Sequence, residues 1–264
     1  MAMAERVSAY HQRRTGVRPN LTDPKTYNDK VQWLKVYDQD PLQIVCCDKI
    51  AVRGHVESIL GPDVLVPLAE QHDYPHVMKC NHNSGGAMRI ENEAHALRVK
   101  PAFDKQLATP YGAHKGEWAY QFVTPQIMRE KIIRSPTDYK AHCVDGQIAW
   151  WQIITARASG RPVSTILDPA GNVLKLQLDH DMFFGTNGSV FPGARAWSRL
   201  TEAAETLAQG WKYVRVDLYW SDGQVYFGEL TFWPKSGCYM TKDIRRFGDM
   251  MPFDTTTKKP AVVT

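Results

Sequence analysis

The chain has 264 residues, of which 43% are hydrophobic and 23% are charged, and its formal net charge is +4. This composition is ordinary for a globular protein with one large core or two to three small subdomains. The positive charge is mild and evenly spread, without the Lys/Arg run that marks a nucleic-acid-binding arm, so we expect no nucleic-acid partner. The charge suits a site for anions such as phosphates or carboxylates.

Cysteine usage and apolar runs indicate the compartment. The five cysteines are odd in number and lack framework spacing, and adjacent Cys46 and Cys47 make a poor disulfide pair. Reduced thiols are therefore expected. The N-terminus lacks the apolar segment of a signal peptide, and no apolar run approaches the roughly 18 residues that span a bilayer. We expect a cytoplasmic protein without a transmembrane segment, and the sequence indicates no oligomeric state.

The first 70 residues are predicted to be mainly helical. A helix and a basic loop occupy residues 1–20, and Thr26 can cap a second helix. A third helix is expected over residues 42–59, followed by a short apolar strand over residues 64–68. We therefore predict an N-terminal helical or α/β region over residues 1–70.

A lysine on a strand precedes a glycine-containing loop in the next segment. Residues 76–80 read as a strand that carries Lys79, and the loop after it contains Ser84, Gly85 and Gly86. Glycines let backbone N–H groups close on phosphate oxygens, and the lysine adds a point charge. A hairpin without function is the commoner explanation of such a loop, and no Gly-Lys-Ser/Thr follows as in a P-loop.

The middle of the chain is predicted to be an antiparallel, hairpin-rich unit over residues 76–155. After a helical stretch, a buried strand is expected over residues 126–133, and a hairpin turns at Asp145-Gly146. Residues 156–196 are irregular. A helix is then predicted over residues 197–210, with Ser198 as its N-cap and Gly210 at its end.

Residues 213–237 carry the strongest signal, two apolar strands joined by a turn at Asp222-Gly223. On one face of the return strand, alternation places Val225, Phe227 and Glu229. Asp217 falls roughly opposite Glu229, and two buried carboxylates need a compensating cation. A hard divalent ion such as Mg²⁺ would supply it. A solvated sheet face, with Arg215 paired to one acid, is an equally good interpretation from spacing alone.

Taken in order, these segments resemble ATP-grasp ligases, and more narrowly the TupA-like branch, which is named for teichuronopeptide biosynthesis. The resemblance covers roughly residues 20–240. It rests on the stretches N-L-T-D-P-K-T-Y-N-D-K-V-Q-W-L-K, D-K-I-A-V-R, V-M-K-C-N-H-N-S-G-G, I-M-R-E-K-I-I, D-Y-K-A-H-C-V-D-G and V-R-V-D-L-Y-W-S-D-G-Q-V-Y-F-G-E-L-T-F.

The resemblance implies an α+β ATP-grasp fold, in which two α+β subdomains grip ATP between antiparallel sheets. The small subdomain, with the glycine loop and hinge strand, would span residues 71–155. The large subdomain, with the metal hairpin, would span residues 156–254. The region over residues 1–70 would lie on the substrate side, and residues 255–264 would form a loosely held tail.

The resemblance also implies a nucleotide site. Lys79 would touch the ATP phosphates, under a loop of Ser84, Gly85 and Gly86. A hinge would read adenine through its backbone, and further residues would meet the ribose and the nucleotide. These residues are Glu130, Lys131, Ile132 and Ile133 for the hinge, Asp138 for the ribose, and Lys140.

The same resemblance implies a metal and substrate site. Asp217 and Glu229 match the magnesium ligands, while Thr231 replaces the asparagine that usually supplies a third ligand. A hydroxyl is a weaker neutral ligand. The residues expected to hold an acyl-phosphate or its carboxylate precursor are Arg157 and Arg215, and Lys49 and Arg53 would lie in the substrate cleft.

The implied activity is ADP-forming, carboxylate–amine ligation through an acyl-phosphate. ATP and Mg²⁺ would be required, with Mn²⁺ possible. The branch suggests that a uronic acid, sugar acid or peptide-polymer carboxylate is joined to an amino acid or amine in surface polysaccharide biosynthesis. Two alternatives stay open: a sugar or small-molecule kinase on the same fold, and a non-catalytic nucleotide- or carbohydrate-binding module with Trp33, Trp150 and Trp151 as a sugar platform.

Overall fold

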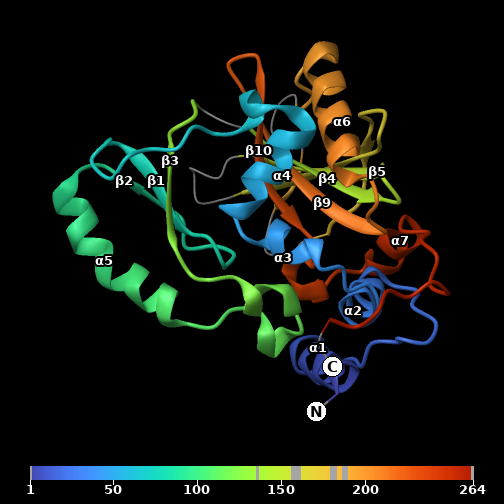
Figure 1. Ribbon diagram of the computed structural model, residues 1–264. Coiled ribbons are helices and arrows are strands. Elements are labelled where there is room, and N and C mark those ends of the chain that lie inside the picture. Colours follow the sequence, from blue (N-terminus) through green and yellow to red (C-terminus); the bar gives the residue numbers. More distant parts are fainter. Residues whose placement is uncertain (1, 135–136, 156–161, 179–182, 186–189, 263–264) are drawn as a thin grey trace.

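Two sheets of unequal size, antiparallel except for the parallel pair of β6 and β8, face each other across the molecule, with helices around them (Figure 1). The computed structural model describes residues 2–134, 137–155, 162–178, 183–185 and 190–262. Helices α1 to α3 and α7 gather below the larger sheet in this view, and α5 flanks the smaller one. The α+β class expected from the sequence is confirmed.

The N-terminal region forms four helices rather than three. These are α1 (Met3–Thr15), α2 (Tyr27–Tyr37), α3 (Leu42–Cys47) and α4 (Ala51–Leu60). The predicted cap of α2 is confirmed, because Thr26 and Asp29 form a reciprocal capping box.

The single helix predicted over residues 42–59 is wrong because Asp48 breaks it. Its Oδ1 accepts hydrogen bonds from the backbone N–H of Ile50 at 2.8 Å and of Ala51 at 3.3 Å. Short acidic side chains compete in this way with helical hydrogen bonds. The same oxygen accepts from Asn81 Nδ2 at 2.9 Å, so the break is fixed to the loop that follows Lys79.

The strand predicted over residues 64–68 is also wrong. A 3₁₀ turn, η1 (Pro62–Val64), is followed by two isolated bridges, from Leu65 to Phe227 and from Leu68 to Glu130. This segment therefore touches both sheets instead of adding a strand to either of them.

The smaller sheet has the order β2-β1-β3, with β1 (His76–Cys80), β2 (Met88–Ile90) and β3 (Ile127–Lys131). Helix α5 (Glu93–Ala108) packs on it through Phe103. In β3 only Met128 is buried, so the prediction of a buried strand there is wrong.

The larger sheet has the order β10-β9-β4-β5-β6-β7, and β8 pairs with β6. Its strands are β4 (Thr137–Val144), β5 (Gln147–Thr155), β6 (Val163–Leu167), β7 (Val173–Leu174), β8 (Phe183–Phe184), β9 (Tyr213–Ser221) and β10 (Gln224–Thr231). The single unit predicted over residues 76–155 is therefore wrong, because β4 and β5 pair with the larger sheet. Subdomain limits remain a proposal, and this topology favours a boundary between Lys131 and Thr137.

Helix α6 (Ala194–Ala208) packs on the larger sheet with Leu200, Ala204 and Leu207 buried. Gly193, not Ser198, precedes its first turn, because the alanine-rich start of the segment is already helical and buries Ala196. Short helices complete the fold: η2 (Ala113–Lys115), η3 (Trp118–Phe122), η5 (Pro234–Gly237) and α7 (Ile244–Asp249).

Two further expectations fail for reasons of packing. Trp33, Trp150 and Trp151 are all at most 2% exposed, so they form core and cannot serve as a sugar platform. The C-terminal segment is held against α2, since Lys259 N–H donates to Tyr37 O at 2.9 Å and Lys259 Nζ lies 2.9 Å from Asp40. It is not a loose tail.

Candidate active site

A cavity of about 490 Å³ lies between the two sheets and collects most of the predicted site residues. It is lined from the smaller sheet and its flanking loop, and from β4, β9 and β10 of the larger sheet. The predicted residues on its wall are Lys49, Lys79, Ser84, Gly85, Glu130, Lys131, Ile132, Ile133, Asp138, Lys140, Asp217 and Glu229. Residues separated by up to 180 positions in sequence, from Lys49 to Glu229, thus share one space.

The glycine loop is anchored at its base by Asn81, which is fully buried. Its side chain donates to Asp48 and to Thr124 O, and accepts from the N–H of Gln126 at 2.7 Å. Lys49 Nζ donates to Asn83 O. Gly86 has a φ of +73°, a left-handed backbone conformation that favours glycine.

Lys79 faces the cavity from β1 and pairs with a carboxylate of the same sheet. Its Nζ lies 2.7 Å from Glu130 Oε2, and Arg53 approaches the other oxygen at 3.6 Å. Burial is substantial, because the Lys79 side chain is 16% exposed. Two cations and one carboxylate leave a positive excess on this wall, which suits a polyanionic ligand.

The end of β3 offers backbone groups to the cavity. Lys131 N–H donates to Pro67 O at 2.8 Å, whereas no other described residue makes a backbone hydrogen bond with Ile132 or Ile133. Their groups therefore remain open to a ligand that carries both donors and acceptors, as an adenine ring does.

The two predicted carboxylates lie opposite each other, but the face assignment of β10 was wrong. Asp217 pairs with Glu229, while Phe227 pairs with Leu218, so the register shifts by one residue at Gly228. This β-bulge moves Glu229 off the face of Phe227 and onto the face of Asp217. Without the bulge, Glu229 would point away from the cavity.

Replacing Gly228 by alanine should displace the bulge. A Cβ at this position would lie 2.9 Å from the backbone oxygen of Asp217, closer than real contacts allow, and 3.1 Å from the Tyr219 ring, which is tighter than most real contacts. We expect a stability loss of about 1–3 kcal/mol, measured by urea denaturation. Gly54→Ala is the control, because nothing lies within 4 Å of its Cβ, and it should raise helix stability by about 1 kcal/mol. Equal stability in the wild type and Gly228→Ala would contradict this account.

The carboxylates are compensated by protein cations. Arg215 Nε lies 2.5 Å from Asp217 Oδ1, its Nη2 lies 3.1 Å from Glu229 Oε1, and Lys140 Nζ contacts Asp217 Oδ2. The arginine pairing that the sequence left open is therefore present, and it links both acids. The face is not solvated, because the Asp217 side chain is only 3% exposed. Paired charges hold the Arg215 pKa well above its usual value, although burial opposes this.

A divalent cation fits this arrangement at Glu229 more readily than at Asp217. Glu229 is 31% exposed, and its Oε2 makes no hydrogen bond with the described residues. Both oxygens of Asp217 already contact Arg215 or Lys140. The donors are hard oxygens, as Mg²⁺ prefers. Within the described ranges, no group of three His, Cys, Asp or Glu side chains could hold a metal by itself.

Thr231 lies beside the carboxylates, and its hydroxyl contacts Glu229 and Arg215. Its hydroxyl donates to Glu229 Oε1 at 2.8 Å and accepts from Arg215 Nη2 at 3.1 Å. The hydroxyl proton is thus committed to Glu229, which favours a positioning role for Thr231 over direct metal ligation.

The chain matches one known protein family over most of its length. The family model described as TupA-like ATP-grasp matches residues 29–250, which is most of the chain. The chain belongs to the TupA-like ATP-grasp family. The fold and family expected from the sequence are confirmed. No curated protein matches the chain.

Solved structures with a similar chain path are distant in sequence. D-alanine–D-alanine ligase of Helicobacter pylori is 12% identical with a TM-score of 0.48, covering 88% of this chain and 69% of that one. The Bacillus anthracis D-alanine–D-alanine ligase is 15% identical, with a TM-score of 0.44 and coverages of 78% and 66%.

A carboxylase domain gives a similar comparison. The biotin carboxylase domain of Hydrogenobacter thermophilus 2-oxoglutarate carboxylase, solved with MgADP, is 13% identical with a TM-score of 0.47, and the coverages are 78% and 45%. Mn²⁺ is named with none of these three structures. The TupA-like chain thus spans between about half and two thirds of their lengths.

A second, smaller cavity of the TupA-like chain adjoins the first at Ser84, which lines both. Its volume is about 240 Å³, and Arg215 and Thr231 lie on its wall. Sequence reasoning missed its other residues, because they come from α1, from residues 111–120 and from residues 233–236, and they form no motif. A cluster of Lys, Glu and Tyr between residues 111 and 120 was the available signal.

Lys35 of α2 holds the loops around this second cavity. It is fully buried and donates to Lys115 O at 2.9 Å, Ser236 O at 2.9 Å and Ser236 Oγ at 2.8 Å. Burial among neutral oxygens lowers the pKa of Lys35 to about 8.

Because the pKa of Lys35 is lower in the folded than in the unfolded chain, its contribution to stability should increase with pH. Between pH 8 and pH 10.5 the unfolded chain binds more protons at this residue. The free energy of unfolding of the wild type minus that of Lys35→Met should therefore rise across this window, by at most about 3 kcal/mol. Urea denaturation at several pH values measures it, with the exposed Lys105→Met as control. A flat or falling difference would contradict the buried charge.

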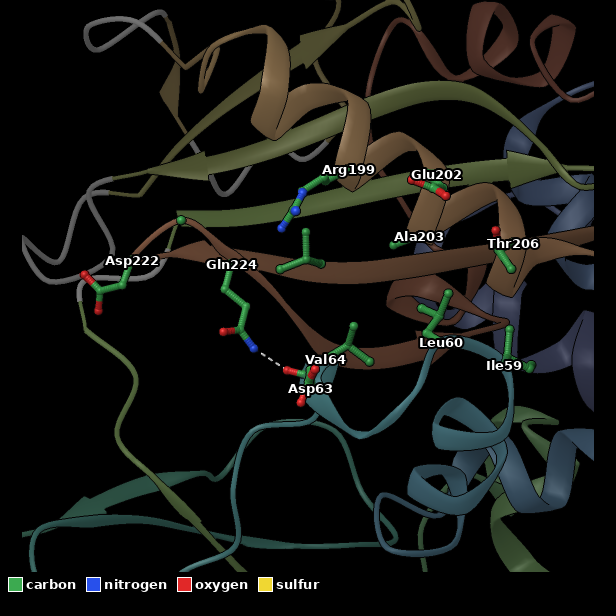
Figure 2. A pocket seen from close by; sticks show the side chains of 12 residues that line it. Ile59, Leu60, Asp63, Val64, Arg199, Glu202, Ala203, Thr206, Asp222 and Gln224 are labelled. Atoms are coloured by element: carbon green, nitrogen blue, oxygen red, sulfur yellow. Dashed lines mark hydrogen bonds between the residues drawn. The ribbon is translucent and has the colours of Figure 1, made fainter.

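Two remaining features lie elsewhere. Arg157 falls outside the described residues, so its predicted role is a proposal only. Gly86 belongs to the glycine loop but does not line the cavity between the sheets. A further hollow, of about 810 Å³, lies between α4, α6 and the β9–β10 turn (Figure 2). There, Gln224 donates to Asp63 O and ties the hairpin to η1. None of the predicted site residues lines this hollow. No helix in the described ranges is long and apolar enough to cross a membrane.

Proposed function

We propose that this chain is an ADP-forming carboxylate–amine ligase that works through an acyl-phosphate. The observation that carries the proposal is the cavity between the sheets, where a lysine wall, open hinge backbone and a carboxylate pair converge. Family membership adds the expectation of ATP as the co-substrate.

ATP would lie with its adenine against Ile132 and Ile133, whose backbone groups are open. Asp138 would meet the ribose, because it is on the same wall in β4. Lys79, Lys140 and the loop of Ser84 and Gly85 would then surround the phosphates. Placing cations and backbone dipoles around transferring phosphoryl oxygens is the main means of catalysing phosphoryl transfer.

Glu229 would hold Mg²⁺. Asp217 would join it as a second ligand once a bound phosphate draws Lys140 or Arg215 away from its carboxylate. When bound there, the ion would neutralise charge on the phosphate oxygens. Thr231 keeps Glu229 oriented through its hydroxyl. The proposed reaction needs no nucleophilic side chain that forms a covalent intermediate with the substrate.

The reaction would have two steps. A substrate carboxylate oxygen bonds to the γ-phosphorus, the bond to the β-phosphate oxygen breaks, and ADP leaves with the electron pair. Arg215, which lines the second cavity and pairs with Asp217 and Glu229 of the first, would hold the acyl-phosphate oxygens. An amine nitrogen then bonds to the acyl carbon, phosphate leaves with the electron pair, and the amine loses its proton to solvent.

The branch resemblance supports a uronic acid, sugar acid or peptide-polymer carboxylate as the acid, in surface polysaccharide biosynthesis in the cytoplasm. A panel of uronic and sugar acids, each combined with amino acids and simple amines, tests the reaction. We expect ADP and phosphate in equal amounts only when both an acid and an amine are present, with a product mass equal to their sum minus water. ADP with a stable phosphorylated product and no phosphate would instead indicate a kinase, and background hydrolysis with every pair would indicate a binding module.

A further inference from the structure

The second cavity, which Arg215 and Thr231 line, contains an unsatisfied buried acid. Glu117 in this cavity is 4% exposed, and its buried Oε2 accepts no hydrogen bond from the part of the chain that the structure describes. Lys115 Nζ is 4.0 Å away, beyond hydrogen-bond distance. A buried carboxylate without donors is costly, so the site calls for a donor group from outside.

Cations stand on the same wall as this acid. Arg14 of α1 is exposed and forms no ion pair with another described residue, and Lys115 Nζ lies 4.2 Å from the centre of the Tyr111 ring. The wall of this space of about 240 Å³ carries this one acid and four cations, Arg14, Lys115, Arg215 and Lys235, of which Arg215 is already paired with Asp217 and Glu229. That volume is below the roughly 300–1,000 Å³ of pockets for drug-sized ligands, so it suits a small ligand that carries both charges.

The position of the cavity fits an attacking amine. Ser84 belongs both to the phosphate-side loop and to this wall, and Arg215 reaches the wall from the carboxylate pair. A ligand held here would lie next to the place where an acyl-phosphate would form. The α1 helix that supplies Arg14 precedes the residues matched by the family model.

We propose that this cavity binds the amine substrate as a free α-amino acid. Glu117 receives the ammonium group, and Arg14 with Lys115 receives the α-carboxylate. The assignment rests on the proposed ligase function for its catalytic meaning, but amino-acid binding can be measured without turnover.

The test is calorimetric titration of the full chain, with Mg²⁺ and a non-hydrolysable ATP analogue present. The probes are L-alanine, L-serine, L-glutamate and L-lysine, each compared with its N-acetyl and α-amide derivative. We expect at least one free amino acid to bind, and each of its derivatives to bind at least about tenfold more weakly, as expected for losing one hydrogen bond to a charged group.

Two variants assign the charges. Glu117→Gln should reduce the N-acetyl penalty to less than about threefold, and Arg14→Gln should do the same for the amide penalty. Arg14 is exposed, so its variant will fold even if Glu117→Gln does not, and Arg13→Gln, next to it on α1, is the control.

The proposal is overturned if no probe binds, if N-acetyl derivatives bind as tightly as free amino acids, or if both penalties persist in the variants. Suppose that the wild type binds free amino acids more tightly than their derivatives, that the variants reduce these differences, and that no acid–amine pair is ligated. This result would reject the proposed ligase function alone. Ligation with penalties that neither variant changes would reject this assignment alone.

Discussion

Glu229→Gln should lower the rate of ATP-dependent ligation by about two to three orders of magnitude. The amide keeps the shape of the side chain and can still accept from Arg215 and Thr231, but it removes the charge that would hold Mg²⁺. Glu229 is partly exposed, so folding should be nearly unaffected. The measurement is coupled ADP release at saturating ATP, with circular dichroism as the check on folding.

Asp222→Asn is the matched control for this prediction. Asp222 is exposed at the turn of the same hairpin and has a φ of +49°, a conformation that asparagine tolerates. Its activity should equal that of the wild type. Full activity of Glu229→Gln across a range of Mg²⁺ concentrations would remove the carboxylate pair from the mechanism.

Arg215→Met should destabilise the chain by about 3–5 kcal/mol and abolish ligation. The guanidinium is the shared partner of Asp217, Glu229 and Thr231, and its loss leaves the buried Asp217 with Lys140 alone. Breaking one side of a buried ion pair costs more than the pair contributes, because the remaining charge stays desolvated.

A double-mutant cycle separates this coupling from simple loss of packing. Arg215→Met combined with Asp217→Asn should cost clearly less than the sum of the single changes, since the uncompensated charge is gone. Arg199→Met on the exposed surface of α6 should stay within about 0.5 kcal/mol of the wild type in urea denaturation. Additive single effects would mean that Arg215 and Asp217 are not coupled.

The sequence predicts the strands and the order of the site residues well, because those depend on local pattern. The alternation in residues 213–221 and the Asp222-Gly223 turn lead directly to the β9–β10 hairpin. Lys79 on its strand and the loop after it are likewise readable. The capping box at Thr26 is a local signal of the same kind.

What the sequence misses depends on contacts between distant segments. The helix over residues 42–59 breaks at Asp48, whose side chain accepts from the N–H of Ile50 and Ala51 and is held in that position by Asn81, 33 residues away. Helical spacing contains no trace of that contact. The bulge at Gly228 changes which face Glu229 occupies, and a single inserted residue leaves the apolar pattern of the strand almost unchanged.

The second cavity is missed for a related reason. Its walls come from four short elements, and Lys35, which holds two of them together, looks from the sequence like an ordinary surface lysine of α2. Which sheet a hairpin joins is also not readable from local sequence. The hairpin of β4 and β5 is formed by neighbouring residues, but its pairing with β9 joins segments that are far apart in the chain.

Transfer of ¹⁸O from substrate to phosphate tests acyl-phosphate ligation most directly. The acid found in the substrate panel would be labelled in both carboxylate oxygens and ligated with unlabelled ATP, and the released phosphate would be analysed by mass spectrometry. Attack of the carboxylate on the γ-phosphorus predicts one ¹⁸O in each phosphate and one in the amide product. Unlabelled phosphate, with the label confined to the acid or its product, would contradict the acyl-phosphate and the ligase mechanism built on it.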